Sequence, residues 1–275
     1  MGRAERIGLL ALPGLSFLAL IYALPLVLLL LKSFQIDGAF SVAEYVTFFS
    51  DPFNLTVLWR TLRVALLTTV LALLIAYPTA IVMARVKGFW LSVFLVAMVL
   101  PMSVGVVVKA FAWSILFRTR GVLNDFLIST GLIDMPIRML FTETALIIGA
   151  ANVFLPFMVL PIYAVLRQMD ARLPEAAASL GATPVFRFTN VTLPLSLPGV
   201  IAGCAFTFSL AISMYVIPSL IVGERQQTLS MLTARSFLFL RNEALGATIS
   251  SILLIIAISV VLGSSWLASR LGARR

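Results

Sequence analysis

Residues 174–194 read PEAAASLGATPVFRFTNVTLP, and they lie in the polar stretch that separates two long apolar segments. A helix can start at Pro174, whose missing N–H would be unpaired there, and Glu175 places negative charge at the positive end of the helix dipole. The alanines that follow are the best helix formers. Gly181 favours the left-handed conformation that ends a helix, and Pro184 prevents continuation. The sequence therefore predicts a helix of about two turns, too short to be stable without packing against another surface.

The spacing within this run has a known counterpart. Glu175-Ala176-Ala177 is followed by three residues, Gly181, nine residues, Val191, one residue and Leu193-Pro194. This pattern resembles the EAA loop in the membrane subunits of binding-protein-dependent ABC importers, which have isoleucine where Val191 stands. In that family the loop docks into a cleft of a separate ATPase subunit. The resemblance therefore implies a cytoplasmic coupling loop over about residues 167–196, although an ordinary capped loop helix would use the same local signals.

The composition of the chain is that of a membrane protein. Hydrophobic residues make up 61% of its 275 residues and charged residues 11%, whereas about a quarter of a typical soluble domain is charged. A helix needs about 20 apolar residues to cross about 30 Å of hydrocarbon. The stretches that are long enough are Ile7–Leu31, Val64–Met83, Phe89–Val108, Ala145–Leu166, Gly199–Val222 and Ala244–Leu267. We predict an all-α integral membrane protein with six transmembrane helices and a single transmembrane domain over residues 1–275, which the resemblance implies is a permease domain.

The distribution of basic residues predicts the orientation. The first apolar run is longer than the core of a signal peptide, so we expect it to remain as a helix. With both termini cytoplasmic, Lys and Arg divide equally between the two faces, but the cytoplasmic ones are concentrated in tails and short loops such as the Arg85/Lys87 turn. The positive-inside rule gives most weight to such loops. We therefore expect a multi-pass protein with both termini cytoplasmic, and the resemblance implies that its membrane is the bacterial inner membrane.

Two long connectors are expected on the external side, Lys32–Arg63 and Lys109–Thr142. The second contains two short segments of amphipathic helical character. Its aromatic residues Trp113 and Phe126 are suited to the interface between membrane and water, where such side chains are enriched. We predict that they anchor this connector at the membrane surface.

Several classes of function are excluded by what the sequence lacks. No GxxxxGK[ST] phosphate loop occurs, and the chain has no histidine and a single cysteine, Cys204. Its carboxylates are scattered over tails and loops, so no catalytic constellation or metal site is expected. The net charge of +9 is spread over helix ends rather than gathered on one basic face, which argues against nucleic-acid binding. We expect no enzyme activity, no metal and no cofactor bound by this chain.

Three further stretches resemble the spermidine/putrescine-type permease subunits. They are GVLNDFL at 121–127, IDMPIRMLFT at 133–142 and LPFMVLP at 155–161. The resemblance implies a type I ABC importer permease that forms the path for a small solute, a polyamine or a related nitrogen compound. It also implies the partners: two ATP-binding subunits, which hold ATP and Mg, a second and non-identical permease subunit, and an extracytoplasmic substrate-binding protein. A permease of the same superfamily for sulfate, molybdate, iron, thiamine or opines is the alternative.

Polar residues inside the apolar segments are candidates for the translocation path, because they are costly in hydrocarbon unless they face a cavity or a partner. The candidates are Ser103, Asn152, Ser209, Ser213 and Tyr215, with Thr207 beside them. A serine hydroxyl can instead bond to the carbonyl four residues earlier in its own helix. An asparagine amide is harder to satisfy in that way, so Asn152 is the best candidate. We expect it to share a central cavity with Ser213 and Tyr215.

The prolines within the apolar segments and the absence of acidic residues there limit the kinds of transport mechanism that the chain can support. Pro101, Pro156, Pro161 and Pro218 each remove a helical hydrogen bond, and broken helices line the sites of many transporters. The interiors of the predicted helices carry no Asp or Glu, which argues against a secondary transporter or a channel with a charged ring. If a polyamine passes, its recognition therefore belongs to the external binding protein, or the partner permease supplies the acid.

Overall fold

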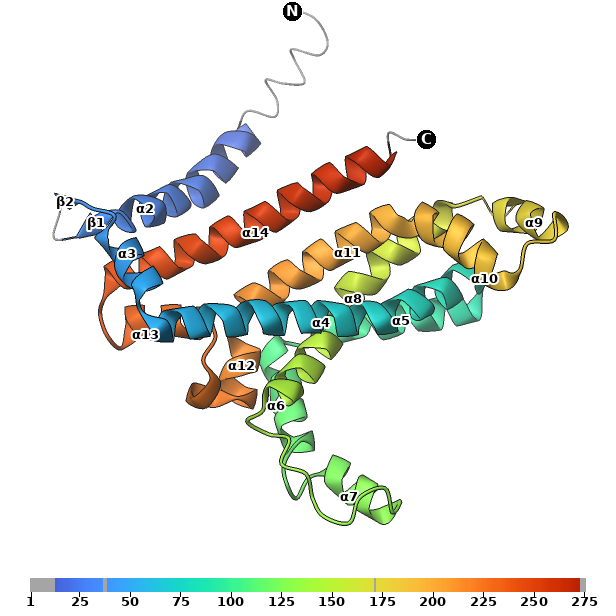
Figure 1. Ribbon diagram of the computed structural model, residues 1–275, viewed down its shortest axis with the longest axis horizontal. Helices are drawn as coiled ribbons and strands as arrows, with labels where there is room; N and C mark the ends of the chain where they lie inside the picture. The colour runs from blue at the N-terminus through green and yellow to red at the C-terminus, as the bar shows by residue number, and fades with distance from the viewer. Residues whose placement is uncertain (1–12, 37–38, 171, 273–275) are drawn as a thin grey trace, which may run out of the picture. The chain divides into compact units, whose positions relative to one another are not determined.

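The computed structural model describes residues 13–36, 39–170 and 172–272 (Figure 1). Contacts divide the chain into two compact units, residues 1–56 with 232–255 and residues 57–231 with 256–275. Among the described residues, five helices are long and apolar enough to cross a membrane, or six if the bent pair Phe89–Ser103 and Val106–Leu116 counts as one span. The predicted all-α membrane architecture is confirmed, and a short two-stranded ribbon is its one addition within the described part of the chain.

The first unit surrounds the turn that follows the first span. It contains η1 (Ala19–Ala23), α2 (Leu24–Lys32), the antiparallel strands β1 (Gln35–Ile36) and β2 (Ala39–Phe40), and α3 (Ala43–Ser50). The described part of this span is Pro13–Lys32, and its expected start at Ile7 lies outside the described residues. Three helices, α4 (Pro52–Arg85), α13 (Leu229–Leu238) and α14 (Glu243–Gly272), contribute residues to both units.

Ser33 fastens this turn to its neighbours. Its hydroxyl shares a hydrogen bond of 2.8 Å with the Tyr45 hydroxyl, and its carbonyl accepts from Thr248 Oγ1 at 3.4 Å. Beside it, Lys32 forms an ion pair with Glu243. These contacts link the end of α2 to α3 and to the start of α14.

The second unit holds most of α4 and all of the remaining helices. They are α4 (Pro52–Arg85), α5 (Phe89–Ser103), α6 (Val106–Leu116), α7 (Val122–Ser129), α8 (Glu143–Gln168), α9 (Arg172–Ser179), α10 (Pro184–Arg187), η2 (Phe188–Thr192), α11 (Leu193–Ser213), α12 (Val216–Ile221) and η3 (Gly223–Gln226). Helix α4 starts twelve residues before the predicted span at Val64, so residues 52–63 are helix and not external loop. The Asp51 carboxylate starts it by accepting the N–H of Phe53 at 2.9 Å.

The third predicted span is broken. Phe89–Val108 was expected as one helix, but α5 ends at Ser103 and α6 starts at Val106, with a bend of 99° between them. Pro101 removes a hydrogen bond near the break, and Gly105 precedes α6 with an extended ψ of 140°. The apolar run therefore continues through a corner that its hydropathy does not reveal.

The fifth predicted span, Gly199–Val222, is also interrupted. Helix α11 stops at Ser213, Met214 is extended with ψ 133°, and α12 follows. Pro218 explains the stop, because a proline ring clashes with the carbonyl four residues earlier, which here belongs to Met214. The helical segment that is long and apolar enough to cross a membrane here is Pro184–Ser213, which starts further toward the N-terminus than the predicted span.

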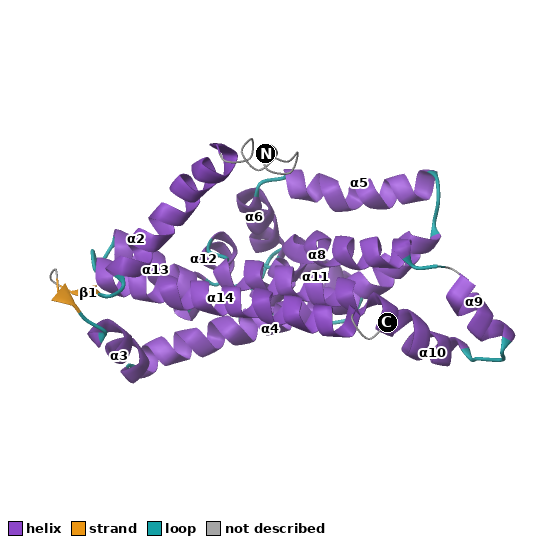
Figure 2. Cartoon of the chain, turned by 90° about the horizontal axis from the view of Figure 1, so that it is seen from above, coloured by secondary structure: helices purple, strands orange, loops and turns teal. Residues whose placement is uncertain are grey.

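Small residues allow α8 and α11 to lie side by side at the centre of the second unit (Figures 1 and 2). A Cβ added at Gly199 would meet the Pro161 carbonyl oxygen at 2.8 Å, and one added at Gly203 would meet Met158 Sδ at 2.9 Å. The buried alanines of α4 at positions 72, 76 and 80 belong to the same core cluster as Met158 and Ile162 of α8. The core therefore forms where glycine and alanine let helices approach closely.

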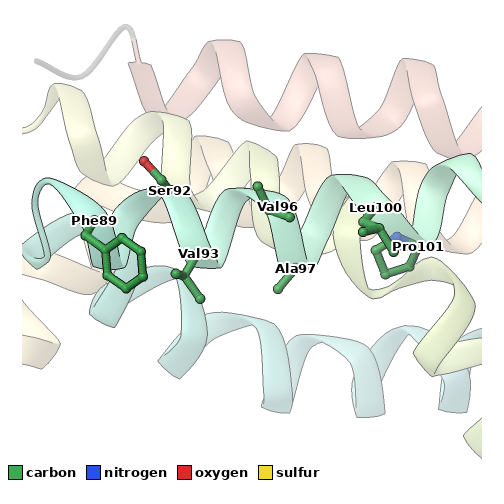
Figure 3. A pocket seen from close by; sticks show the side chains of 7 residues that line it. All are labelled: Phe89, Ser92, Val93, Val96, Ala97, Leu100 and Pro101. Atoms are coloured by element: carbon green, nitrogen blue, oxygen red, sulfur yellow. The ribbon is translucent and has the colours of Figure 1, made fainter.

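Helix α5 is apolar on the face that it leaves uncovered. Figure 3 shows its side chains along a hollow of about 490 Å³, which is lined by Phe89, Ser92, Val93, Val96, Ala97, Leu100 and Pro101. Phe94, Leu95 and Met98 face the other way, toward the core around α8. Hydrophobic side chains on both faces are typical of a helix that lies in hydrocarbon.

Candidate coupling and translocation site

The predicted short helix is α9, and its C-terminal end has the predicted geometry. Gly181 has φ +82°, its N–H donates to the Ala178 carbonyl at 2.9 Å, and the N–H of Ala182 donates to the Ala177 carbonyl at 3.0 Å. These two bonds are the Schellman motif, which requires a left-handed residue at this position. The start differs from the prediction: α9 begins at Arg172, before Pro174, and the Asp170 carboxylate accepts the Arg172 N–H at 2.9 Å.

The residues that were predicted to couple to an ATPase divide into an exposed group and a half-buried group. Glu175, Ala176 and Gly181 are exposed, whereas Ala177, Val191, Leu193 and Pro194 are half-buried. The last three lie in η2 and at the start of α11, so they belong to the root of the long span. Between the two groups, Leu180 is 88% exposed and Val185 71% exposed. Apolar side chains exposed in this way on a polar loop are typical of a surface that another protein covers.

Pro184 starts a second short helix. The Thr183 hydroxyl caps α10 by accepting the N–H of Phe186 at 3.3 Å, and Pro184 is the first residue of the helix, where its missing N–H costs nothing. Helix α10 continues through η2 into α11, so the loop ends in the rigid body of the core.

Tyr77 anchors this root, and sequence reasoning missed it. Its hydroxyl shares a hydrogen bond of 2.7 Å with the buried Ser196 hydroxyl on α11, and its ring packs edge-on against Phe188 at 5.7 Å between centroids. Tyr77 lies on α4, so α4 and α11 are held together where the loop ends. A tyrosine and a serine more than a hundred residues apart carry no signal that pairs them in a single sequence.

Asn152 lies beside the corner between α5 and α6. Its Oδ1 accepts a hydrogen bond of 3.2 Å from the indole Nε1 of Trp113, which is on α6. A hollow of about 350 Å³ opens here, lined by Leu100, Pro101, Val104, Lys109, Ala112, Trp113, Leu116 and Asn152. The Trp113 ring also packs against Phe117 at 5.0 Å and lies over Gly149. Trp113 thus contacts protein on α8, although it was predicted to anchor a loop at the membrane surface.

The other candidates for the path lie elsewhere in the second unit. The Ser213 hydroxyl donates to the Ser209 carbonyl at 2.8 Å within α11, which is the alternative noted for serines in helices. The hydroxyls of Thr207 and Ser209 are buried and have no hydrogen-bond partner among the described residues. Tyr215 occupies the break between α11 and α12 and is 45% exposed, and Ser103 is exposed at the end of α5. The hollow beside Asn152 is not lined by these residues in the described part of the chain.

The chain is similar to known transport proteins over most of its length. Residues 69–274 match the family model described as "Binding-protein-dependent transport system inner membrane component". The spermidine/putrescine transport system permease protein PotB of Haemophilus influenzae is 34% identical over 242 residues, which cover 86% of this chain and 84% of the relative. PotB of Escherichia coli is 34% identical over 221 residues, 80% of each protein.

A solved structure shares the fold. The crystal structure of a bacterial alginate ABC transporter in complex with an alginate pentasaccharide-bound periplasmic protein contains a chain that matches with a TM-score of 0.76. The match covers 98% of this chain and 96% of that one at 18% sequence identity. At this identity the likeness supports the arrangement of helices and carries no argument about the solute.

Proposed function

The chain belongs to the binding-protein-dependent transport system inner membrane component family, and we propose on that basis how it couples and what it carries. It is the inner-membrane permease subunit of an ABC importer and not an enzyme. We propose that it forms the path for a polyamine or a related small nitrogen compound, which an extracytoplasmic binding protein delivers. The observation that best supports coupling to an ATPase subunit is the exposed helix α9, which ends at a left-handed glycine and has the EAA spacing.

The coupling loop of the proposal extends over about residues 167–196. Glu175, Ala176, Ala177 and Gly181 would contact a partner ATPase, while Val191, Leu193 and Pro194 would transmit its movement into α11. The exposed Leu180 and Val185 support this contact, because burying apolar surface stabilises an interface. ATP and Mg would be bound by the ATPase subunits, and this chain would bind no cofactor.

The proposed assembly has a second, non-identical permease subunit beside this one. Residues 1–275 would act in it as one transmembrane permease domain, with both termini in the cytoplasm. Closure of the two ATPases would move the paired coupling loops and reorient the helices around the path as rigid bodies.

The path would include Asn152, Ser103, Ser209, Ser213 and Tyr215. The hollow beside Asn152 is lined by a cation, Lys109, and no carboxylate lines it among the described residues. This supports a path that selects weakly, with recognition of a cationic solute left to the binding protein or to an acid of the second permease. A permease for sulfate, molybdate, iron, thiamine or opines is the other candidate, because Lys109 would suit an anionic or zwitterionic solute.

Gly181 tests the coupling role. Gly181→Val should lower polyamine-stimulated ATP hydrolysis of the reconstituted importer at least severalfold, because a β-branched residue at φ +82° costs about 1–2 kcal/mol and misdirects α9. Gly181→Asn is the matched control and should retain most of the activity, since asparagine tolerates this conformation.

Two results would overturn parts of this proposal. If Gly181→Val kept the wild-type rate of polyamine-stimulated ATP hydrolysis, the proposed contact between this loop and the ATPase would be wrong. Stimulation by sulfate or molybdate, with no response to spermidine or putrescine, would leave the coupling role intact and replace the proposed solute.

A further inference from the structure

A large hollow lies between α9 and the ends of the long helices. Its volume is about 740 Å³, and its lining residues are Ile81, Ala84, Arg85, Lys87, Leu166, Arg167, Met169, Pro174, Glu175, Arg187 and Thr192. They come from the end of α4, the turn before α5, the end of α8, and the segment from α9 to η2. Figure 1 shows these ends together at one end of the second unit.

The hollow is basic. Arg85, Lys87, Arg167 and Arg187 line it, against one carboxylate, Glu175. In the described part of the chain, none of these five groups has a partner of opposite charge within 4.0 Å. The Nε of Arg187 is buried and has no hydrogen-bond partner among the described residues. Four cations around one hollow repel each other, so an anion between them would be favoured.

The two ends of α4 contrast in this respect. Near its start, Arg60 and Arg63 both form ion pairs with Glu143, with Arg60 Nε at 3.3 Å from the carboxylate. At its other end, Arg85 has no such carboxylate among the described residues. Glu143 therefore neutralises the arginines near the start of α4, whereas the basic residues around the hollow at its other end have no paired carboxylate among the described residues.

Three of these cations lie at the ends of helices that are long and apolar enough to cross a membrane. Arg85 is the last residue of α4, Arg167 is next to the last residue of α8, and Arg187 ends the first turn of the span Pro184–Ser213. The ends of membrane-spanning helices lie where the hydrocarbon meets the headgroups. The hollow is also half apolar, since Ile81 and Leu166 belong to its lining. A ligand that fits it carries an anionic head and an apolar body.

We propose that this hollow binds the phosphate-bearing headgroup of an anionic phospholipid. The phosphate would lie among the arginines, away from Glu175, and the glycerol and the upper acyl chains would cover Ile81, Ala84, Leu166 and Met169. Basic pockets between membrane helices on the cytoplasmic side bind anionic lipid headgroups in this way. A free phosphate would satisfy the charges and leave the apolar half of the hollow uncovered.

This site would also support α9. Pro174 and Glu175 line the hollow from α9, and Arg85 and Arg167 line it from the helix ends of the core. A lipid bound there fills the space between the coupling helix and the core, so it would stabilise the position of α9. The inference does not depend on the identity of the solute. Glu175 also belongs to the ATPase contact of the proposed function, so the test follows lipid retention and the assembly of the ATPase subunits separately.

The experiment compares phosphatidylglycerol with phosphatidylcholine on the purified importer. After delipidation, native mass spectrometry would measure the lipid retained, and thermal unfolding would give the lipid concentration for half-maximal stabilisation. We expect phosphatidylglycerol to be retained in preference, and Arg85→Gln/Arg187→Gln to raise its half-maximal concentration about tenfold or more. The effect should weaken at high salt, because the charges lie near the surface.

A matched variant and two competitors make the test specific. Arg118→Gln/Arg120→Gln removes two exposed arginines outside the hollow and should leave retention of phosphatidylglycerol unchanged. Inorganic phosphate and glycerol 3-phosphate at equal concentration should compete poorly. The proposal fails if both lipids are retained equally, if the free phosphates compete as well as the lipid, or if Arg85→Gln/Arg187→Gln loses its ATPase subunits while it keeps wild-type retention of phosphatidylglycerol.

Discussion

At the scale of single residues, the pairing of Asn152 with Trp113 shows how a polar group is accommodated in this membrane protein. The amide oxygen accepts the indole N–H at 3.2 Å across two helices. Pro156 lies four residues later and has no N–H, so the Asn152 carbonyl lacks its helical partner as well. Trp113 therefore satisfies the side-chain acceptor of a residue whose backbone carbonyl has lost its helical donor.

The first residue-scale prediction concerns this pair. Asn152→Ala and Trp113→Phe each remove the hydrogen bond, and such bonds in membranes average about 0.6 kcal/mol, so the melting temperature of the complex should barely change. We expect the uptake rate or the basal ATPase activity to change more, because Asn152 lines the hollow. Both are measured on equal amounts of assembled complex.

The double variant provides the control. If the hydrogen bond is what matters, Asn152→Ala/Trp113→Phe should lose no more activity than either single variant. Unchanged uptake together with a reduced amount of folded complex would make the pair a structural contact and remove Asn152 from the path.

At this scale the sequence predicts local conformation and the need for a hydrogen-bond partner, but it does not identify a partner on another helix. The need of Asn152 for a partner follows from its amide, and the left-handed Gly181 follows from its place after three alanines, a serine and a leucine. The identity of the partner does not follow, because Trp113 is 39 residues away in the chain and looks equally suited to a membrane surface. Tyr77 and Ser196 were missed for the same reason.

At the scale of elements, apolar runs predict where helices exist better than where they end. The fourth predicted span, Ala145–Leu166, lies inside α8, whereas the third and the fifth cover corners. In both corners a proline and a nearby residue with extended backbone break the hydrogen-bond ladder while the side chains stay apolar. The hydropathy of an apolar run does not change at such a corner, so proline is its only sign in the sequence. Proline alone does not predict a corner, because Pro156 and Pro161 lie within the unbroken α8.

The close approach of α8 and α11 supports an element-scale prediction. Gly199→Ala would place a methyl group 2.8 Å from the Pro161 carbonyl oxygen and 3.0 Å from Ile162 Cα. Both are backbone atoms that cannot rotate away, so the helices must separate. Overpacking of this kind costs about 1–3 kcal/mol. We expect a lower melting temperature and less assembled importer, measured by thermal unfolding and by size-exclusion chromatography.

Gly263→Ala on α14 is the matched control. An added Cβ there meets no atom within 4 Å, and alanine favours a helix more than glycine does. This variant should be neutral or slightly more stable. An equal loss in both variants would mean that glycine matters for the helices themselves and not for their packing.

At the scale of the whole molecule, the sequence predicts the membrane helices and the short helix α9 far better than the hollows inside the fold. The number and rough position of the spans follow from composition, because hydrocarbon thickness fixes the length of an apolar helix. The loop follows from a spacing that its local chemistry also explains. The hollows beside Asn152 and α9 depend on the way in which distant segments pack, and a single sequence does not carry that information.

Orientation is the last prediction and the one on which the coupling role depends. After Cys204→Ala removes the native cysteine, Ser50→Cys and Asp125→Cys should react with an impermeant thiol reagent added to intact cells, and Thr189→Cys should react only after permeabilisation. All three positions are exposed, so burial within the chain does not explain a failure to react. The expected pattern follows from the basic Arg85/Lys87 turn, which the positive-inside rule retains in the cytoplasm. The reverse pattern would place α9 outside the cell, out of reach of any ATPase, and the coupling role would have to be abandoned.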